Sequence, residues 1–344
     1  METADKVIIV FVLILIISIW VILNPNSQVL GLTKGDITTG KKAPELQGIK
    51  GYINTDGKEI KLADYIGKKI ILIDFWTYTC INCIRTLPYL KQWDEKYRED
   101  GLQIIGVHAP EFEFEKDYNN VKKAVEEHGL KYPTVLDNDH ATWNAYDNHY
   151  WPAKYLIDKN GNIVYHHFGE GNYEEIEAKI QELLADLKNT TVKKPMSRPS
   201  EVEIVSGSIG TPELYFGYNF RRANLGNQPK SMLPDKEYKF TITGDLLPNK
   251  PYLEGEWKNN ADDFELVSDS GRILLSYKAK NVNIVAGSAA GSAIAVSVDW
   301  KEHKEIAVNG FDLYRVVEGN DYESRSLELN ITGKGFKIST FTFG

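Results

Sequence analysis

The sequence predicts an α/β domain followed by an all-β sandwich or jelly roll, with one apolar helix ahead of both. Between residues 43 and 188, buried strands alternate with helices, which indicates an α/β layer architecture. From residue 201 onward, short alternating runs are separated by Gly, Asn and Asp, a pattern typical of sandwiches. A chain of 344 residues is also long for one hydrophobic core, so two domains are expected.

The composition fits a globular protein and argues against two classes of function. A hydrophobic fraction of 42% and an aromatic fraction of 11% are enough for real cores. The net charge of -8 argues against a nucleic-acid partner, since phosphate binding needs a basic face. Two cysteines are too few for a disulfide-stapled scaffold, so Cys80 and Cys83 must act as one pair.

The first expected element is a membrane anchor at residues 7–23, which hold one polar side chain, Ser18, and no charge. At about 1.5 Å per residue, this run is at the lower limit for crossing a bilayer. A cleaved signal peptide and a buried core helix are the alternatives, although no clear small-residue cleavage site follows. We expect residues 1–6 as a cytoplasmic stub and residues 24–344 outside the cytoplasm at the cell membrane, beginning with a tether at 24–42.

The α/β domain at residues 43–188 contains continuous apolar runs and amphipathic segments in alternation. The expected elements are strands at 68–76 and 102–109, a hairpin over 153–169 with an Asp-Lys-Asn-Gly turn, and helices at 81–98, 116–128 and 173–188. Residues 189–200 hold two prolines and no apolar period, which favours an interdomain linker. The sandwich occupies residues 201–344, where no helix is expected.

Cys80 and Cys83 fall between a buried strand and the start of a helix. Unpaired backbone N–H groups and the helix dipole favour an anion there. We therefore expect Cys80 as the exposed nucleophile and Cys83 as the shielded thiol that resolves a mixed disulfide. The alternatives are a zinc site, which lacks four ligands; covalent haem attachment, which Ile84 rules against; and a structural disulfide, which would close too short a loop to stabilise much. No metal and no cofactor is expected.

The stretch ILIDFWTYTCINC resembles the active-site strand and turn of thioredoxins, with Trp76 four residues before Cys80. The resemblance implies that Asp74 is a buried carboxylate that accepts a proton from Cys83 through water. A solvated strand-end residue is the alternative for Asp74. Ile81 and Asn82, between the cysteines, would tune the thiolate and hence the reduction potential.

Several further motifs resemble the periplasmic thioredoxin-like region of DipZ-type proteins, close to the TlpA and ResA redoxins: GVHAPEFEFEKD, YPTVLDND, WPAKYLID and FGEGNY. The resemblance implies that Pro152 is a cis-proline facing the cysteines, so that a substrate peptide can pair with the backbone beside Trp151. An ordinary trans turn is the alternative. Glu111 lies where related redoxins carry an active-site carboxylate, and a solvated loop residue is an equally open reading.

The sandwich also resembles the C-terminal region of DipZ-type proteins, through TPELYFGY, LEGEW, DLYRVVEG and FTFG. That region is similar to carbohydrate-binding modules, which implies a glycan site. A stacking platform for sugar rings would use Tyr215, Tyr218, Tyr252 and Trp257. Aromatic residues that alternate along strands can equally belong to the core, and the sandwich can also serve to dock against the first domain.

The function expected from these features is a membrane-anchored, extracytoplasmic thiol-disulfide oxidoreductase. It would exchange a Cys80–Cys83 disulfide with exported proteins, with reduction as the expected direction. DipZ-type proteins also carry a multi-span region resembling CcdA, so the electron donor would be a separate CcdA-like membrane protein. The alternative is an envelope glycan- or protein-binding module on a redox-inactive thioredoxin scaffold.

Overall fold

The computed structural model describes residues 40–200, 209–220 and 225–344, and residues 40–344 form one compact unit. The expected membrane span at 7–23 and most of the tether lie outside the described residues. Along the described chain, no helix is long and apolar enough to cross a membrane.

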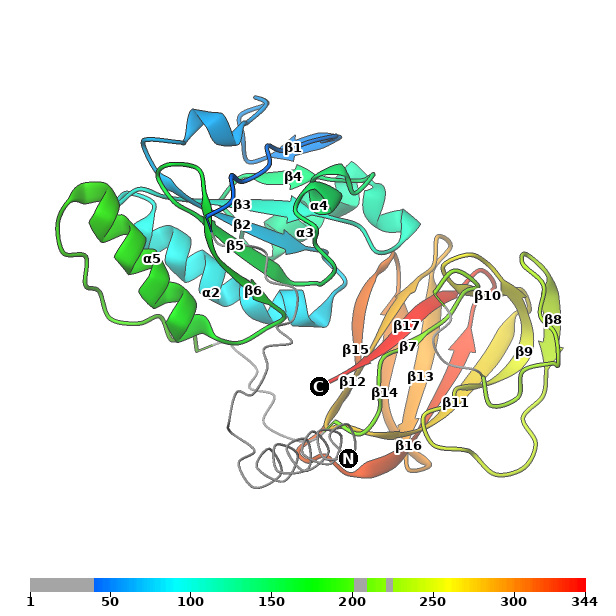
Figure 1. Ribbon diagram of the computed structural model, residues 1–344. Helices are drawn as coiled ribbons and strands as arrows, with labels where there is room; N and C mark the ends of the chain where they lie inside the picture. Colours follow the sequence, from blue (N-terminus) through cyan, green and yellow to red (C-terminus); the bar gives the residue numbers. More distant parts are fainter. Residues whose placement is uncertain (1–39, 201–208, 221–224) are drawn as a thin grey trace, which may run out of the picture. The chain divides into compact units, whose positions relative to one another are not determined.

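Residues 40–200, called here the α/β part, form a six-stranded sheet with helices on both faces (Figure 1). Its strands follow the order β1-β4-β3-β2-β5-β6, in which β2, β3 and β4 are parallel and the other pairings are antiparallel. The strands are β1 Gly51–Ile53, β2 Ile70–Trp76, β3 Leu102–His108, β4 Thr134–Leu136, β5 Ala153–Ile157 and β6 Ile163–Phe168. The helices are η1 Leu62–Asp64, α2 Ile81–Tyr97, η2 Glu113–Lys116, α3 Tyr118–Glu127, α4 Ala141–Ala145 and α5 Tyr173–Lys188.

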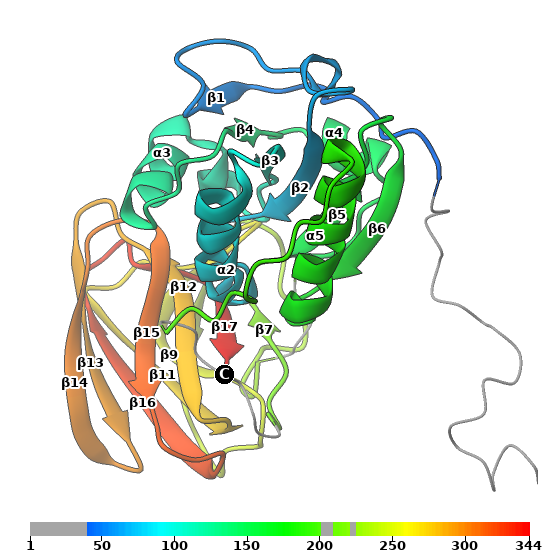
Figure 2. The ribbon, with the colours of Figure 1, turned by 90° about the vertical axis from the view of Figure 1, so that its left-hand side faces the viewer.

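Strand β2 lies in the middle of this sheet, and all seven of its residues are buried. Leu72 and Trp76 belong to the core that also contains side chains of α2 and α5. Figure 2 shows α2 and α5 on the same side of the sheet. Phe75 points to the other face, where its ring meets Trp143 of α4 edge-on. Burial on both faces explains why this strand is a continuous apolar run rather than an alternating one.

The α/β part is the thioredoxin fold that the resemblance predicts, and the expected strands and long helices are confirmed within two residues or so at most of their ends. The turn between β5 and β6 is closed by Gly161 N, which donates to Asp158 O at 2.9 Å. The sequence predicts none of the five short elements β1, η1, η2, β4 and α4, because three to five residues carry too little periodicity to be recognised.

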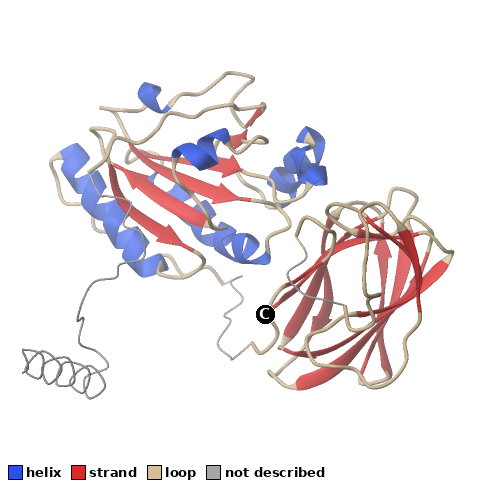
Figure 3. Cartoon of the chain, turned by 45° about the vertical axis from the view of Figure 1, so that its right-hand side comes forward, coloured by secondary structure: helices blue, strands red, loops and turns tan. Residues whose placement is uncertain are grey.

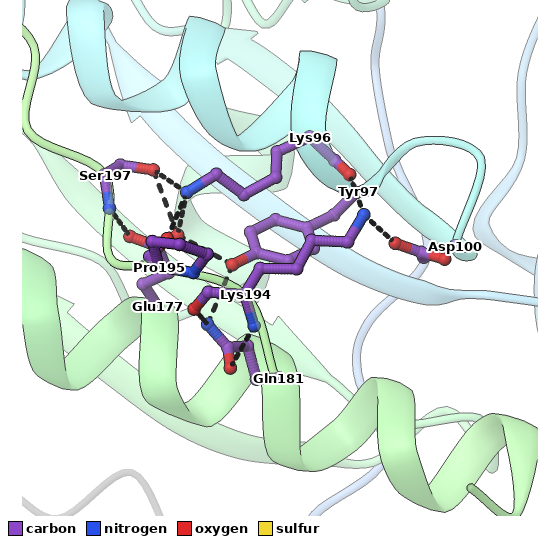
Figure 4. A network of polar contacts seen from close by, with 8 residues as sticks. All are labelled: Lys96, Tyr97, Asp100, Glu177, Gln181, Lys194, Pro195 and Ser197. Atoms are coloured by element: carbon purple, nitrogen blue, oxygen red, sulfur yellow. Dashed lines mark hydrogen bonds and ion pairs between the residues drawn. The ribbon is translucent and has the colours of Figure 1, made fainter. Parts of the chain in front are cut away.

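Residues that follow α5 are bound to α2 and α5 by a buried polar network (Figure 4). Glu177 accepts hydrogen bonds from Tyr97 Oη at 2.7 Å and from Ser197 N at 2.6 Å. Lys96 adds an ion pair of 2.7 Å to the same carboxylate. The segment that the sequence assigns to a linker is therefore held against the α/β part at Ser197.

The described residues from 209 onward, called here the β part, form strands and loops without a helix (Figure 3). Its strands are β7 Leu214–Tyr215, β8 Glu237–Phe240, β9 Tyr252–Asn259, β10 Phe264–Leu266, β11 Ser270–Lys278, β12 Asn281–Gly287, β13 Ser292–Val298, β14 Lys301–Val308, β15 Asp312–Glu318, β16 Ser324–Thr332 and β17 Lys337–Phe343. All of their strand pairings are antiparallel, and they enclose one apolar core. This confirms a sandwich-like antiparallel sheet, while the jelly-roll connectivity stays a prediction.

Strand β9 joins the two halves of that sheet. It pairs with β11 through residues 252–254 and with β10 through residues 257–259. Gly255 lies between these two pairings with a φ of +107°, a conformation that favours glycine. One sheet of eleven strands results, with nine in a continuous hydrogen-bonded path and β7 and β8 paired to β17 and β9 beside it.

The two parts touch through the loop that follows β3. Phe112, Tyr215 and Val285 form a buried apolar cluster that draws on both parts. Phe114 stacks on Phe311 with ring centroids 4.7 Å apart. This contact brings strands β7, β12 and β17 close to the segment that carries the two cysteines.

Candidate active site

Cys80 lies at the N-cap of α2, directly after the turn that follows β2. Its backbone is extended, with φ -78° and ψ 110°, and its Sγ accepts a hydrogen bond from Cys83 N at 3.2 Å. N-cap residues satisfy one of the unpaired N–H groups of the first turn, and here a sulfur atom does so. The expected position of the pair at a helix N-terminus is confirmed.

The two thiols differ in their access to solvent. Both are free, with Cys80 half-buried and Cys83 fully buried. Burial raises the pKa of the Cys83 thiol well above its ordinary value, and the neighbouring Cys80 sulfur adds to this effect. An accessible first thiol and a shielded second thiol are the arrangement that two-step thiol–disulfide exchange requires.

Asp74 lies in the middle of β2, on the face that also carries Cys83 in its core. It is fully buried, and its Oδ1 faces Lys154 Nζ at 3.3 Å. Burial raises the pKa of Asp74, while the Lys154 charge acts in the opposite direction. Neither charged group has another hydrogen-bond partner among the described residues. The structure thus places a carboxyl group with an elevated pKa beneath the cysteines.

A second buried carboxylate, Glu115, supports the turn at residues 77–80, called here the cysteine turn. Its Oε1 accepts a hydrogen bond at 2.6 Å from the Oγ1 of Thr79, the residue that precedes Cys80. Its Oε2 accepts from Glu111 N at 2.6 Å and from Phe112 N at 3.0 Å. Burial raises the pKa of Glu115, and these donors oppose that rise. Glu115 thereby ties the cysteine turn to the loop after β3.

His108 ends β3 and is fully buried. Its Nε2 lies 3.3 Å from Thr77 Oγ1, and its ring stacks on that of Tyr78. Burial lowers the pKa of His108 to about 3. The imidazole is therefore neutral at physiological pH and packs beneath the turn that leads to Cys80.

A cavity of about 210 Å³ opens beside Cys80, and we call it the Cys80 cavity. From the α/β part it is lined by five residues that the sequence singles out: Cys80, Ile81, Asn82, Glu111 and Trp151. From the β part it is lined by Glu213, Tyr215, Val285, Thr340 and Thr342. The reactive thiol thus faces a wall made by a different part of the chain.

Two other expected site residues, Pro152 and Trp76, do not line the cavity. The Trp151–Pro152 peptide bond is cis, as the resemblance implies, and Pro152 directly precedes β5. Trp151 donates through Nε1 to Ala109 O at 3.0 Å, which fixes its ring at the cavity. Trp76 is fully buried beneath the turn, where it meets His108 edge-on, so it supports the site without reaching it.

The expected sugar-stacking platform is wrong for three of its four residues. Trp257 is fully buried in the core of the β part, and Tyr252 is 4% exposed. Tyr215 is 7% exposed and lines the Cys80 cavity. Tyr218 is half-buried and its hydroxyl donates to Asp235 at 3.4 Å. Because inward positions of a sandwich fill with large side chains, Trp257 and Tyr252 pack the interior, as the core alternative describes.

Sequence reasoning missed Lys154, Glu115 and His108. Lys154 carries the clearest signal, since a lysine interrupts an otherwise apolar strand directly opposite Asp74 in the register of β2 and β5. Glu115 is the third residue of a short 3₁₀ turn, the position from which a carboxylate reaches back to the first N–H group. His108 carries no comparable signal, because its burial depends on packing from distant segments.

The chain matches two family models. One, described as the AhpC/TSA family, matches residues 39–166, and the other, described as a thioredoxin like C-terminal domain, matches residues 211–344. Protein DipZ of Mycobacterium tuberculosis is 37% identical over 306 residues, which make up 88% of this chain and 43% of that protein. The chain thus spans less than half the length of this relative.

Two shorter relatives are covered over most of their length. The thiol-disulfide oxidoreductase YkuV of Bacillus subtilis is 33% identical over 42% of this chain and 94% of that protein. The thiol-disulfide oxidoreductase ResA of Bacillus thuringiensis is 32% identical over 44% of this chain and 81% of that protein. The AhpC/TSA match at residues 39–166 contains both Cys80 and Cys83. The chain therefore belongs to the thioredoxin-like thiol-disulfide oxidoreductases.

Proposed function

We propose that this protein reduces disulfides in exported proteins, with Cys80 as the nucleophile and Cys83 as the resolving thiol. The observation that carries this proposal is the difference in access between the two sulfurs. Cys80 lines an open cavity, whereas Cys83 is fully buried one helical turn further on. Only Cys80 can meet a substrate disulfide, and Cys83 can reach only Cys80.

The exchange proceeds in two steps. The Cys80 thiolate attacks one sulfur of the substrate disulfide, a mixed disulfide forms, and the other substrate sulfur leaves as a thiolate. Cys83 then loses its proton and attacks Cys80 Sγ, which releases the second substrate sulfur. The substrate gains two electrons and two protons, and the protein is left with a Cys80–Cys83 disulfide.

Asp74 accepts the Cys83 proton in the second step, through water. Burial raises the pKa of both groups, so the proton is held between two groups that are each costly to ionise. The positive charge of Lys154, 3.3 Å from Asp74 Oδ1, stabilises the ionised form of Asp74. This pairing supports general-base assistance near neutral pH.

The lining of the Cys80 cavity favours reduction over oxidation. A strongly oxidising pair needs a reduced form that is specifically stabilised, as positive groups near the thiolate would do. Among the described lining residues, Glu111 and Glu213 carry negative charge, and no Lys or Arg is present. The lining thus adds no cationic side chain beside the Cys80 sulfur, which supports a dithiol that gives up its electrons readily.

We further propose that residues 7–23 anchor the chain and that residues 24–344 work outside the cytoplasm at the cell membrane. Oxidised protein would then need electrons from a separate CcdA-like membrane protein. The apolar run at 7–23 supports this proposal. Labelling of Cys80 in intact cells by a membrane-impermeant maleimide tests it, because protection from the reagent would place the cysteine inside.

The reduction potential of the full chain, measured in a dithiothreitol series, tests the direction of electron flow. A value near about -270 mV is expected for a reductant, whereas a value near about -120 mV would make the protein a donor of disulfides. Failure to form a Cys80–Cys83 disulfide at any potential would overturn the redox proposal itself.

A trapping experiment tests the assignment of the two thiols. Cys83→Ser should accumulate a mixed disulfide with oxidised insulin, because the second step is blocked. The matched variant Cys80→Ser should accumulate none. Equal trapping by both variants would contradict the assignment.

A further inference from the structure

We propose that the β part completes the substrate site, and that the Cys80 cavity selects peptide disulfides with a lysine or arginine beside the cysteine. The inference rests on the proposed oxidoreductase function and adds the class of substrate. It assigns Thr342 and Glu213, both from the β part, to substrate binding.

The first observation is an unsatisfied polar group. Thr342 lies on β17, is 5% exposed and lines the Cys80 cavity. Its Oγ1 is buried and has no hydrogen-bond partner among the described residues. Leaving a buried hydroxyl unpaired is unfavourable, so such a group in the wall of a cavity beside a reactive thiol indicates a missing partner. A peptide carbonyl or N–H group of a bound substrate supplies one.

The neighbouring Thr340 shows that this is not a general feature of the strand. Thr340 also lines the cavity and is 1% exposed. Its Oγ1 donates to Leu214 O at 3.1 Å, so its hydrogen-bonding capacity is used within the β part. Two threonines on one face of β17 therefore differ, and of the two only the Thr342 hydroxyl lacks a hydrogen-bond partner among the described residues.

The second observation is the charge of the cavity. Glu111 comes from the loop after β3 and Glu213 from the segment before β7, so each part of the chain contributes one carboxylate. Tyr215 Oη donates to Glu213 Oε2 at 3.0 Å, and both carboxylates act on the Tyr215 hydroxyl.

Besides Cys80 and the phenols of Tyr150 and Tyr215, the lining contains one more titratable side chain, that of His149, which is exposed and lies 3.3 Å from Asp147. The cavity is thus negative overall, and its charge favours a substrate that brings its own cation. An ammonium or guanidinium group placed beside the cysteine would meet Glu213 and Glu111 while the disulfide meets Cys80. Oxidised glutathione carries carboxylates, and the same charges repel it.

The size of the cavity agrees with this occupant. A volume of about 210 Å³ admits a short peptide segment beside Cys80 and not a folded domain. A disulfide on an extended or unfolded chain therefore reaches this space more readily than one within a compact domain. That preference fits proteins that have just been exported better than native, compact ones.

The test measures the rate of mixed-disulfide formation between the reduced full chain and two short peptide disulfides. One peptide carries Lys and the other Glu beside each cysteine, and each rate is divided by the rate with neutral oxidised dithiothreitol. This ratio corrects for changes in folding or thiol reactivity. At low salt, the lysine peptide should react at least about tenfold faster than the glutamate peptide.

Two variants and one matched control locate the effect. Glu213→Gln should reduce the preference for the lysine peptide to about threefold or less, and Thr342→Val should slow both peptides by about fivefold relative to dithiothreitol. Glu302→Gln removes an exposed carboxylate of the β part that is not in the cavity lining, and it should leave the preference unchanged.

Equal rates for the two peptides, equal behaviour of Glu213→Gln and Glu302→Gln, or an unchanged rate in Thr342→Val would each overturn the inference. None of these results affects the oxidoreductase function. If the reduced chain reacts with neither peptide and with no oxidised protein such as insulin, the proposed function fails instead.

Discussion

Two carboxylates, Asp74 and Glu115, are both fully buried near the cysteines, yet their surroundings differ. Asp74 faces one ammonium group at 3.3 Å and has no other polar partner among the described residues. Glu115 accepts three hydrogen bonds, from Thr79 Oγ1 and from two backbone N–H groups.

The difference follows from where each residue lies in its element. Asp74 is in the interior of β2, whose backbone donors are already used by β3 and β5 on either side. Glu115 is in the first turn of a 3₁₀ helix, where N–H groups have no partner within the helix. A carboxylate within a sheet is therefore free to titrate, whereas one at a helix start becomes a structural acceptor.

The largest effect is expected for Glu115→Ala. Removal of the carboxylate leaves the Thr79 hydroxyl and two backbone N–H groups buried without an acceptor, at roughly 1–3 kcal/mol each. The free energy of unfolding, measured by urea denaturation, should fall by about 4 kcal/mol. A loss below about 1 kcal/mol would show that Glu115 does not hold the cysteine turn.

A smaller effect, on rate, is expected for Asp74→Asn. The second step of exchange should slow by about 10- to 100-fold at pH 7, because the proton acceptor is lost. Burial raises the pKa of Asp74, so in the wild type this step should gain rate as pH rises above the ordinary range of a carboxyl group, and the variant should lack that rise. Single-turnover fluorescence during decay of the mixed disulfide measures both.

Loss of the Asp74 charge also leaves Lys154 buried without its partner, which destabilises the fold. The double variant Asp74→Asn with Lys154→Met removes both charges and should recover stability while the second step remains slow. Recovery of the rate together with the stability would mean that Asp74 acts through structure alone.

His108 adds a titration of opposite sign to those of the two carboxylates. Its pKa falls from 6.5 to about 3 on folding. Between these two pH values, the unfolded chain binds a proton that the folded chain does not bind. The stability that neutral His108 contributes is present above pH 6.5 and is lost as pH falls toward 3. Asp74 and Glu115 have raised pKa values, so their contributions are instead lost as pH rises.

Acidification from pH 7 to pH 5 should therefore lower the free energy of unfolding of the wild type by about 2 kcal/mol more than that of His108→Gln. Urea denaturation at both pH values measures this difference. An identical pH dependence for the two proteins would contradict the assignment of His108 as a buried neutral imidazole.

The smallest effect is expected for Glu113→Gln, which is the matched control for Glu115. Glu113 lies on the same 3₁₀ turn, but its side chain is 77% exposed and forms a 2.6 Å ion pair with Lys116 at the surface. Exposed pairs contribute little, so the free energy of unfolding should change by about 0.5 kcal/mol or less. A larger change would indicate that charge on the turn, rather than burial, governs its stability.

The sequence alone determined the features that depend on local pattern. The continuous apolar run of β2, the cysteine spacing and the Asp-Lys-Asn-Gly turn predicted the strand, the reactive turn and the hairpin, because each is set by a few consecutive residues. The cis peptide before Pro152 and the buried carboxyl of Asp74 came from the resemblance of this local pattern to thioredoxins.

Tertiary structure alone decided which distant residues share the site. Lys154 is 80 residues from Asp74 in the numbering and becomes its partner only through the antiparallel pairing of β5 with β2. Thr342 and Glu213 reach Cys80 only because the loop after β3 packs on the β part. Burial depends on all the segments that surround a side chain, so Trp257, which the pattern allowed to face solvent, became core, and Tyr215 became part of the wall beside Cys80.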